Sequence, residues 1–492
     1  MKKYLWLLFL LCPLFLSAKT TVLYHTSDVH GFFYPREGRG GFAALKAVLN
    51  GEKRPFLLLD SGDFANGTAE TRSSKGLKAV EMMNRMGYDA ATVGNHEFDF
   101  TEDGLAPLFE KADFAVLAAN LRNTDSGGFP AFVQPYRVFE ADGVRVGVVG
   151  LANRKPAKPV KKYRFSKPLE ALEKALAAME AQKPDVVVVL AHDSLADYKN
   201  GILPYMGDIA LKYGGRVHAV LGGHAHKIFQ NEYINGVLFV ESGSYLTGVS
   251  RITVETDDET GKFVSAKSEL IPLVTAKTGE DPEIKAFANA LREPGIDEVL
   301  GFAGETLAKK PADSSCQDGA LDDWVADLGR SYSGAEVFIH NTGGTRVDMK
   351  KGPVTLRSLT ELFPFDDSVV LMRVSGRMLK KFIKDGLLPW NKYTYSGLTV
   401  SYRKGKTGKV RDLAVSVNGK PLENRKIYTV GTNSFVAGHK TFSRVADKKS
   451  AGPKTVRALL EDALENGPVF PPRTGRIGNV RRPCDCAAFL LL

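Results

Sequence analysis

Polar side chains that can bind metal ions follow many of the apolar runs in the first half of this 492-residue chain. Each run is short, rich in β-branched residues and bounded by Gly, Asp or Asn, which is typical of β-strands. Because ligands bind at the carboxyl ends of strands in open α/β sheets, we expect these side chains to meet at one edge. The metal-capable residues that directly follow five of the runs are Asp28, His30, Asp63, Asn95, His192, His224 and His226.

The chemistry of this set indicates a site for divalent metal ions. Imidazoles mixed with carboxylates suit Zn²⁺, Mn²⁺ or Fe²⁺ rather than the soft ions that prefer thiolates. The set is larger than one open catalytic ion needs, so two ions that share a carboxylate fit it better. Such a pair, about 3.5–4 Å apart, can hold a hydroxide and neutralise the oxygens of an attacked phosphorus atom. Each residue alone could cap a helix or pack in the core, but their joint placement at strand ends favours a metal centre.

The elements that must position these residues alternate between apolar runs and helical stretches. The runs 20–25, 144–150 and 185–191 are examples of predicted strands, and helices are predicted near 76–86 and over 169–182. This alternation predicts a layered α/β structure in which helices cover the sheets.

The second half of the chain has a different pattern, with mixed strands and helices and no internal repeat. This pattern predicts a separate α+β domain, joined to the first by a polar, helix-like connection near 281–300. We expect the chain to be organised as a signal peptide (1–18), a catalytic domain (19–275), a linker helix (276–301), a substrate-binding domain (302–482) and a short tail (483–492).

Composition and charge are those of a globular protein. Hydrophobic residues make up 43% and charged residues 25% of the chain, which excludes a disordered, collagen-like or multi-span membrane protein. The formal net charge is +10, but no single basic block carries the excess. We interpret it as a general attraction for anions and expect no nucleic-acid partner.

The first 18 residues have the features of a secretory signal peptide. Lys2 and Lys3 precede an apolar stretch that ends in Ser17-Ala18, a small-residue cleavage site. Because a membrane span needs about 20 apolar residues, an uncleaved anchor is the less favoured alternative. We expect a periplasmic or extracellular protein without stable membrane insertion after cleavage.

Export would leave an odd number of cysteines. In an oxidising compartment, Cys484 or Cys486 could form a disulfide with Cys316. The two C-terminal cysteines could instead bind a metal or have no role. We expect no catalytic function for any of the three.

The motifs DVH, GD, GNHEFD, AHD and GGHAH, in this order, resemble the pattern of calcineurin-like metallophosphoesterases. GNHEFD followed by a domain with NxGGxR resembles the secreted 5′-nucleotidase and UDP-sugar hydrolase family over nearly the whole mature chain. This resemblance implies a catalytic domain built as a four-layer sandwich of sheets with outer helices. It also implies two ions (Zn, Mn or Fe), one held by Asp28, His30, Asp63 and His226 and the other by Asp63, Asn95, His192 and His224.

The resemblance also implies which residues form the catalytic pair and which bind the substrate. His96 would stabilise charge on the transferred phosphoryl group and on the leaving oxygen, and Asp99 would orient it. In the second domain, glycines let the backbone approach an anion, and an Arg side chain can donate two hydrogen bonds to it. Two aromatic residues would sandwich the base. The implied substrate-binding residues are Asn341, Gly343, Gly344, Arg346, Phe365 and Phe435.

Two positions depart from the pattern of the family. Gln317 stands where the family commonly has an Arg before a helix start. The run 438–442 after Phe435 is shorter than the family's loop and lacks its ligand-contacting Asp. These departures predict loose discrimination among nucleosides.

The resemblance implies an exported phosphoesterase that hydrolyses nucleoside 5′-monophosphates and related nucleotides by attack of a hydroxide held between the two ions. One alternative is a 2′,3′-cyclic-nucleotide phosphodiesterase with 3′-nucleotidase activity, and another is a thiosulfate-ester hydrolase of the same fold. A non-catalytic surface protein would be expected to have lost ligands, and here the whole set is present. The oligomeric state stays open.

Overall fold

The computed structural model describes residues 18–100, 102–156, 160–202, 204–310, 317–387, 393–405, 409–443 and 445–479. The predictions for the signal peptide, for Cys316 and for the tail with Cys484 and Cys486 lie outside these residues. The chain forms two compact units: Met1–Phe64 with Ala79–Ala288, and Ala65–Lys78 with Asn289–Leu492. We call them the N-terminal unit and the C-terminal unit. Within the described residues, no helix is both long and apolar enough to cross a membrane.

The N-terminal unit contains two six-stranded mixed sheets. The first runs in the order β14 (Phe263–Pro272), β13 (Gly248–Asp257), β1 (Ala18–Thr26), β2 (Phe56–Asp60), β3 (Ala90–Thr92) and β4 (Ala115–Leu117). The second runs in the order β11 (Ile228–Ile234), β12 (Val237–Ser242), β10 (Ala219–Gly222), β9 (Val186–Ala191), β7 (Val144–Leu151) and β6 (Tyr136–Ala141).

The two sheets pack face to face through one apolar core. Leu23, Leu57 and Leu59 of the first sheet share this core with Val188 and Leu190 of the second. The strands that contribute are nearly continuous apolar runs because both of their faces are buried. The predicted strands in this half of the chain are therefore confirmed.

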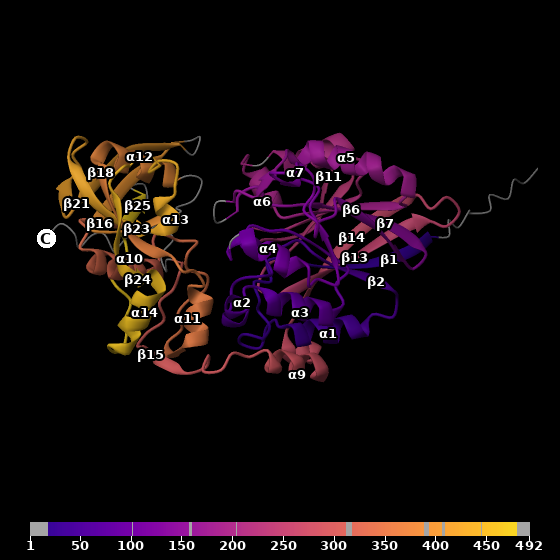
Figure 1. The fold of residues 1–492 in the computed structure, drawn as a ribbon, viewed down its shortest axis with the longest axis horizontal. Helices are drawn as coiled ribbons and strands as arrows, with labels where there is room; N and C mark the ends of the chain where they lie inside the picture. The colour runs from indigo at the N-terminus through magenta and orange to yellow at the C-terminus, as the bar shows by residue number, and fades with distance from the viewer. Residues whose placement is uncertain are drawn as a thin grey trace, which may run out of the picture. The chain divides into compact units, whose positions relative to one another are not determined.

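Helices cover the outer faces of the sandwich. The outer face of the second sheet packs on α5 (Pro168–Met179) and α7 (Tyr205–Tyr213), and Figure 1 places α1 (Phe42–Gly51) and α3 (Leu77–Met86) on the opposite side. The order helix, sheet, sheet, helix confirms the predicted four-layer fold. The hairpin β13–β14 is an addition that the sequence analysis does not foresee.

The C-terminal unit is α+β, as predicted. A five-stranded sheet has the order β19 (Tyr393–Ser396), β16 (Val337–Asn341), β23 (Ile427–Asn433), β18 (Ser368–Ser375) and β24 (Lys448–Thr455). A smaller sheet has the order β22 (Lys420–Pro421), β21 (Val410–Val417), β20 (Leu398–Lys404) and β25 (Ile477–Asn479), and β15 (Val299–Ala303) pairs with β17 (Gly352–Thr355).

Two apolar cores hold this unit together. One joins the smaller sheet and α12 (Gly376–Gly386) to the five-stranded sheet. The other lies under α10 (Ala320–Ser333), α11 (Leu356–Leu362) and α14 (Val456–Glu465). The sheet between them ends in the loops that follow β16 and β23, and a short helix, α13 (Ser434–Ala437), begins directly after β23.

The connection between the units is only partly helical. Within the predicted linker, α9 covers Pro282–Ala290, and β15 begins at Val299. The boundaries predicted for the domains remain predictions.

Candidate metal centre

The carboxyl ends of parallel strands from both sheets of the N-terminal unit meet at one site. Asp28 and His30 follow β1, Asp63 follows β2, and Asn95 follows β3. The second sheet contributes His192 after β9 and His224 with His226 after β10. The loops are joined by their backbones, since the N–H of Asp28 donates to the Gly62 carbonyl at 3.0 Å and that of His30 to the Asp63 carbonyl at 2.9 Å.

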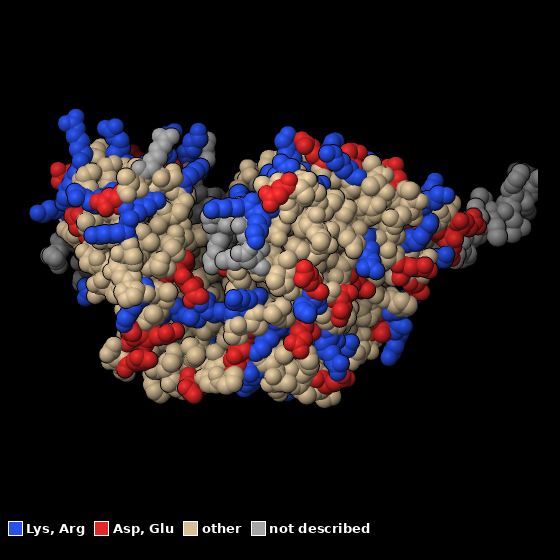
Figure 2. Space-filling view, viewed as in Figure 1, with Lys and Arg blue, Asp and Glu red and all other residues tan. Residues whose placement is uncertain are grey.

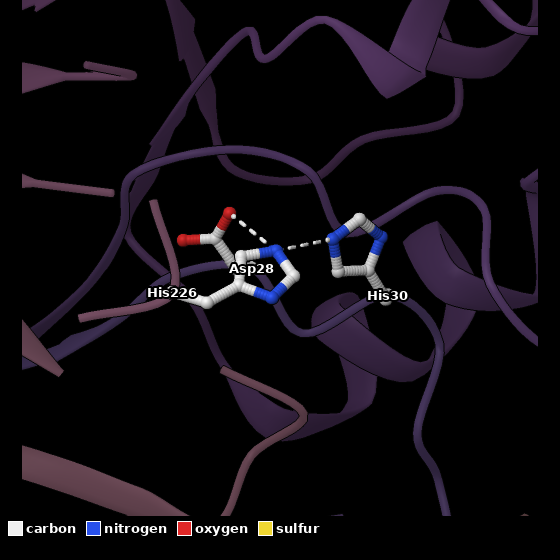
Figure 3. Close-up of side chains that lie close together, drawn as sticks. All are labelled: Asp28, His30 and His226. Carbon is white, nitrogen blue, oxygen red and sulfur yellow. Dashed lines mark hydrogen bonds and ion pairs between the residues drawn. The ribbon is translucent and has the colours of Figure 1, made fainter. Parts of the chain in front are cut away.

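A first group of ligand atoms is formed by Asp28, His30 and His226, all within 4.8 Å of one another. Figure 3 shows the two imidazole rings and the carboxylate turned toward one another. The Nε2 atoms of His30 and His226 are 3.2 Å apart, and His226 Nε2 is 3.5 Å from Asp28 Oδ1. Three such atoms converging on one point fit a divalent ion.

A second group is formed by Asp63, His192 and His224, again within 4.8 Å. His192 donates from Nδ1 to the Ser61 carbonyl at 2.6 Å, which directs Nε2 into the site. That Nε2 lies 2.9 Å from Asp63 Oδ2 but lacks hydrogen-bond geometry. The Oδ1 atom of Asn95 is also buried and finds no hydrogen-bond partner among the residues that the structure describes. Buried polar atoms left unsatisfied in this way fit ligands of a metal ion.

The ligand loops depend on backbone conformations that most residues avoid. Five of the predicted ligands have positive φ: Asp28 at 52°, His30 at 51°, Asp63 at 60°, His224 at 75° and His226 at 55°. At Gly94, next to Asn95, a Cβ atom would overlap the Asp63 carboxylate, so only glycine fits there.

The structure brings together His96 and Asp99, the two residues that the sequence analysis predicts to be catalytic. His96 Nδ1 lies 2.7 Å from Asp99 Oδ2, and both side chains are buried. The backbone N–H of His96 donates to Asp63 Oδ1 at 2.8 Å, so the same loop holds the pair beside the ligands. A carboxylate at Nδ1 fixes the ring and directs Nε2 outward, where it can meet a reacting group.

Burial and neighbouring charge shift the protonation of the ligands. Burial raises the pKa of Asp28 to about 6 and lowers the pKa of His224 to about 3. Burial also acts to raise the pKa of Asp63, but the nearby His192 and His96 outweigh it and hold that pKa well below its usual range. An ionised Asp63 and a neutral His224 are the forms in which these residues bind metals.

Glu97 is a residue of this site whose role the sequence analysis missed. Its carboxylate is buried and accepts backbone hydrogen bonds from Asp63 at 3.0 Å, Phe64 at 2.9 Å and Gly94 at 2.6 Å. It therefore ties the loop after β2 to the loop after β3. The signal was available, because Glu97 stands inside GNHEFD between two residues assigned to chemistry.

The predicted substrate-binding residues lie in the C-terminal unit: at the end of β16 and in the loop after it, in the loop after α11, and in α13. The Arg346 guanidinium lies over the Phe365 ring, 6.0 Å from its centroid. The Phe435 side chain, on α13, is 51% exposed although it is a large aromatic residue. An exposed aromatic ring can stack on a planar ligand.

The segment 341–346 is held by three contacts from outside it. The Thr345 hydroxyl donates to the Asp322 carboxylate of α10, and the Arg346 N–H donates to the Leu362 carbonyl at 2.8 Å. The Asn341 amide accepts from Asn433 at 2.6 Å. Gln317, in place of the expected Arg, donates its backbone N–H to the Ile477 carbonyl at 3.1 Å.

Both units match families of known proteins. Residues 21–228 match the model of calcineurin-like phosphoesterases, and residues 299–447 match that of the 5′-nucleotidase C-terminal domain. The chain is 24% identical to the 5′-nucleotidase of Vibrio cholerae serotype O1, over 94% of this chain and 93% of that protein. Among the solved structures, a 5′-nucleotidase precursor from Thermus thermophilus has a TM-score of 0.83 at 24% identity, covering 94% of this chain and 99% of that one.

Other relatives carry different names. Endonuclease YhcR of Bacillus subtilis (strain 168) is 26% identical over 88% of this chain, and the trifunctional nucleotide phosphoesterase protein YfkN of the same organism is 25% identical over 93%. This chain spans only 38% and 35% of the length of those two proteins. The sulfate thiohydrolase SoxB of Thermus thermophilus shares the fold with a TM-score of 0.78 at 16% identity, over 94% of this chain and 97% of that one.

Proposed function

We propose that this chain is an exported enzyme that hydrolyses nucleoside 5′-monophosphates and related nucleotides. The reason is that it belongs to the family of calcineurin-like phosphoesterases with a 5′-nucleotidase C-terminal domain. The matches support the broader class, a metal-dependent phosphoric ester hydrolase. The observation that best supports the narrower proposal is the convergence of two ligand groups beside His96.

Two divalent ions would occupy the two ligand groups. The first would be held by Asp28, His30, Asp63 and His226, and the second by Asp63, Asn95, His192 and His224. Such ions activate water and withdraw charge from phosphoryl oxygens. The protein's part is to keep the ligand atoms in place and the Asp63 carboxylate ionised. A set of nitrogen and oxygen ligands suits Zn, Mn or Fe.

His96 would act on the substrate directly. With Asp99 accepting from Nδ1, a protonated ring would donate from Nε2 to a phosphoryl oxygen or to the leaving oxygen. Asp99 would stabilise the positive ring and hold its orientation. His96 has no metal-ligand role in this proposal, which separates its effect from that of Asp63.

The C-terminal unit would bind the rest of the nucleotide. Arg346 would donate charge-assisted hydrogen bonds to phosphate or ribose oxygens, and the open backbone at Gly343 and Gly344 would let an anion approach. Phe365 and Phe435 would stack on the base. Asn341 would contact the ligand from the end of β16.

A panel of esters tests this proposal. Purified protein would be assayed against nucleoside 5′- and 3′-monophosphates, 2′,3′-cyclic nucleotides, a nucleotide sugar, single-stranded DNA and a thiosulfate ester, with metal analysis on the same samples. We expect the highest kcat/KM on 5′-monophosphates and about two ions per chain. A preference for cyclic nucleotides, DNA or sulfur esters would replace the proposal by that activity, since all of these relatives share the fold.

A further inference from the structure

We propose that the buried Asn433 fixes the orientation of the Asn341 amide, so that Asn341 offers a hydrogen-bond donor to an acceptor atom of the bound nucleobase. This inference rests on the proposed function, because it assumes that the C-terminal unit binds a nucleotide. It makes Asn433 a positioning residue that determines specificity without touching the ligand.

The orientation of Asn433 is set by a backbone group that can only donate. The N–H of Val436 donates to Asn433 Oδ1 at 2.8 Å, and Asn433 is the N-cap of α13. Because a backbone N–H cannot accept, the oxygen of the Asn433 amide must face Val436. Its nitrogen must then face the other way. Asn433 is fully buried, so water cannot replace either partner of its amide.

The next contact transmits this polarity to Asn341. Asn433 Nδ2 lies 2.6 Å from Asn341 Oδ1, and since Nδ2 can only donate, the atom that it meets must be the oxygen of Asn341. The Asn341 Nδ2 atom therefore points away from Asn433. Within the described residues it has no hydrogen-bond partner, and the Asn341 side chain is partly exposed.

The space beside this amide is open. Gly343 is the neighbour of Asn341 in the loop, and even a Cβ atom at Gly343 would approach no closer than 3.8 Å to Asn341 Nδ2. Phe435, the half-exposed ring of α13, is two residues after Asn433. If a nucleobase stacks on Phe435, the Asn341 Nδ2 group can donate a hydrogen bond to a carbonyl oxygen or an unprotonated nitrogen at the edge of that base.

We call the chain of hydrogen bonds from Val436 through Asn433 to Asn341 the amide relay. The two neighbouring strands keep this relay rigid. β16 and β23 are parallel neighbours, with Ile339 paired to Thr432. The Thr432 hydroxyl donates to the Ile339 carbonyl at 2.8 Å, and the Ser434 hydroxyl donates to Asp367 at 2.8 Å. Both neighbours of Asn433 are thus held, and the amide has no freedom to turn over.

The decisive variant is Asn433→Asp, which inverts the relay. An Asp carboxylate still accepts from Val436 but cannot donate to Asn341. The Asn341 amide would then turn its nitrogen inward and present its oxygen to the ligand. We expect the ratio of kcat/KM for a nucleoside 5′-monophosphate to that for ribose 5-phosphate to fall about tenfold, mainly through KM. The kinetics on ribose 5-phosphate itself should not change.

Two further variants control this experiment. Thr429→Val removes a hydroxyl of the same strand, four residues before Asn433, that accepts from the Glu336 backbone at 3.0 Å, so its ratio should equal that of the wild type. Asn341→Asp keeps the contact with Asn433 but presents only acceptor atoms, so it should lower the ratio further than Asn341→Ala does. If Asn433→Asp does not fold, the two Asn341 variants are compared instead. A kcat/KM ratio in Asn341→Asp that is no lower than in Asn341→Ala would overturn the proposal.

The outcomes separate this inference from the proposed function. Wild-type protein that hydrolyses no nucleotide would show that the proposed function is wrong. Wild-type protein that prefers nucleotides over ribose 5-phosphate, together with folded Asn433→Asp that keeps the full preference, would overturn the inference alone.

Discussion

Asp63 is the carboxylate on which the metal centre converges. Its Oδ2 atom lies 2.9 Å from His192, its Oδ1 atom accepts from the backbone of His96, and its own backbone is held by Glu97. Of the seven proposed ligands it is the one assigned to both ions. Its replacement should therefore affect both ligand groups at once.

We expect Asp63→Asn to lower bound metal below the wild-type content and to abolish hydrolysis together. Asn tolerates the positive φ of this position, so the fold should survive while the negative charge is lost. Metal analysis and turnover would be measured on the same preparation. Asp185→Asn, in a carboxylate that accepts from the Arg145 backbone of the same unit, is the matched control. A folded Asp63→Asn variant with full metal and normal turnover would contradict the shared-ligand assignment.

His96→Ala separates chemistry from metal binding. We expect metal content to stay at the wild-type value while kcat falls by roughly 10²–10⁴, the usual effect of losing a positioned acid–base group. His218→Ala removes an imidazole elsewhere in the same unit, where Nδ1 accepts from the Val187 backbone, and should leave kcat unchanged. Loss of metal on removal of His96 would mean that it is a ligand and not a catalytic group.

At the scale of elements, the site depends on how loops after neighbouring strands are joined. Glu97 lies in the 3₁₀-helix η1 (His96–Phe98) and accepts from the backbones on either side of the β2–β3 junction. A charged acceptor of three backbone donors keeps these loops in register. This is a positional role, since Glu97 is assigned no metal.

Glu97→Gln should weaken metal binding by about 10–100-fold, the usual range for groups that support metal ligands. The Gln nitrogen would face a backbone N–H, and the loop carrying Asp63 would shift. Titration of the metal-free protein with Mn²⁺ measures the affinity. Asp318→Asn is the control, because Asp318 also accepts three backbone hydrogen bonds (from Gly475, Arg476 and Ile477) but lies in the C-terminal unit. Equal losses of Mn²⁺ affinity in both variants would indicate a general effect on stability.

Much at this scale follows from the sequence, and the exceptions have physical causes. Buried parallel strands such as β9 are continuous apolar runs and are easily identified. β13 and β14 have one partly exposed face, so polar residues interrupt their apolar pattern and they were not predicted. The convergence of the candidate ligands could be predicted because they follow strand ends in sequence. The place of Glu97 inside GNHEFD was an available signal, but the backbone contacts that define its role form only in the folded loops. Asn433 could not be assigned a role, because only the folded loops bring its amide to Asn341.

At the scale of the molecule, the catalytic groups and the proposed nucleotide grip belong to units with separate cores. The apolar core of each unit is built from that unit's own residues. Figure 2 shows basic and acidic side chains intermixed on the visible face, and α12 carries the exposed Arg377, Lys381 and Lys384. A net positive charge favours anionic substrates over long distances.

Arg346→Ala tests the division of labour between the units. We expect KM for nucleotides to rise by about tenfold or more, because each charge-assisted hydrogen bond contributes about 1.5–3 kcal/mol. A small artificial phosphate ester, which needs only the metal centre and His96, should be affected much less. Arg330→Ala, on α10 of the same unit, controls for the loss of a guanidinium. Equal damage to both substrates would show that Arg346 supports the fold or the metal site.

Removal of the ions should lower the local stability of the N-terminal unit and leave that of the C-terminal unit unchanged. A ligand at one hundred times its dissociation constant stabilises the state that binds it by about 2.7 kcal/mol. We expect a chelator to increase hydrogen exchange in the loops after β1, β2, β9 and β10. Peptides from β16 and β23 should exchange as before. Equal changes in both units would contradict separate cores, and no change at all would contradict metal binding.

The left-handed backbone at five of the ligands also bears on how such a chain changes over generations. Residues other than glycine held in this region cost about 1–3 kcal/mol each. A duplicated gene whose product no longer needs to bind metal would encode a more stable protein if these residues were replaced by glycine. We therefore expect such a gene to lose these side chains, and the complete set to persist only in chains that still use bound ions.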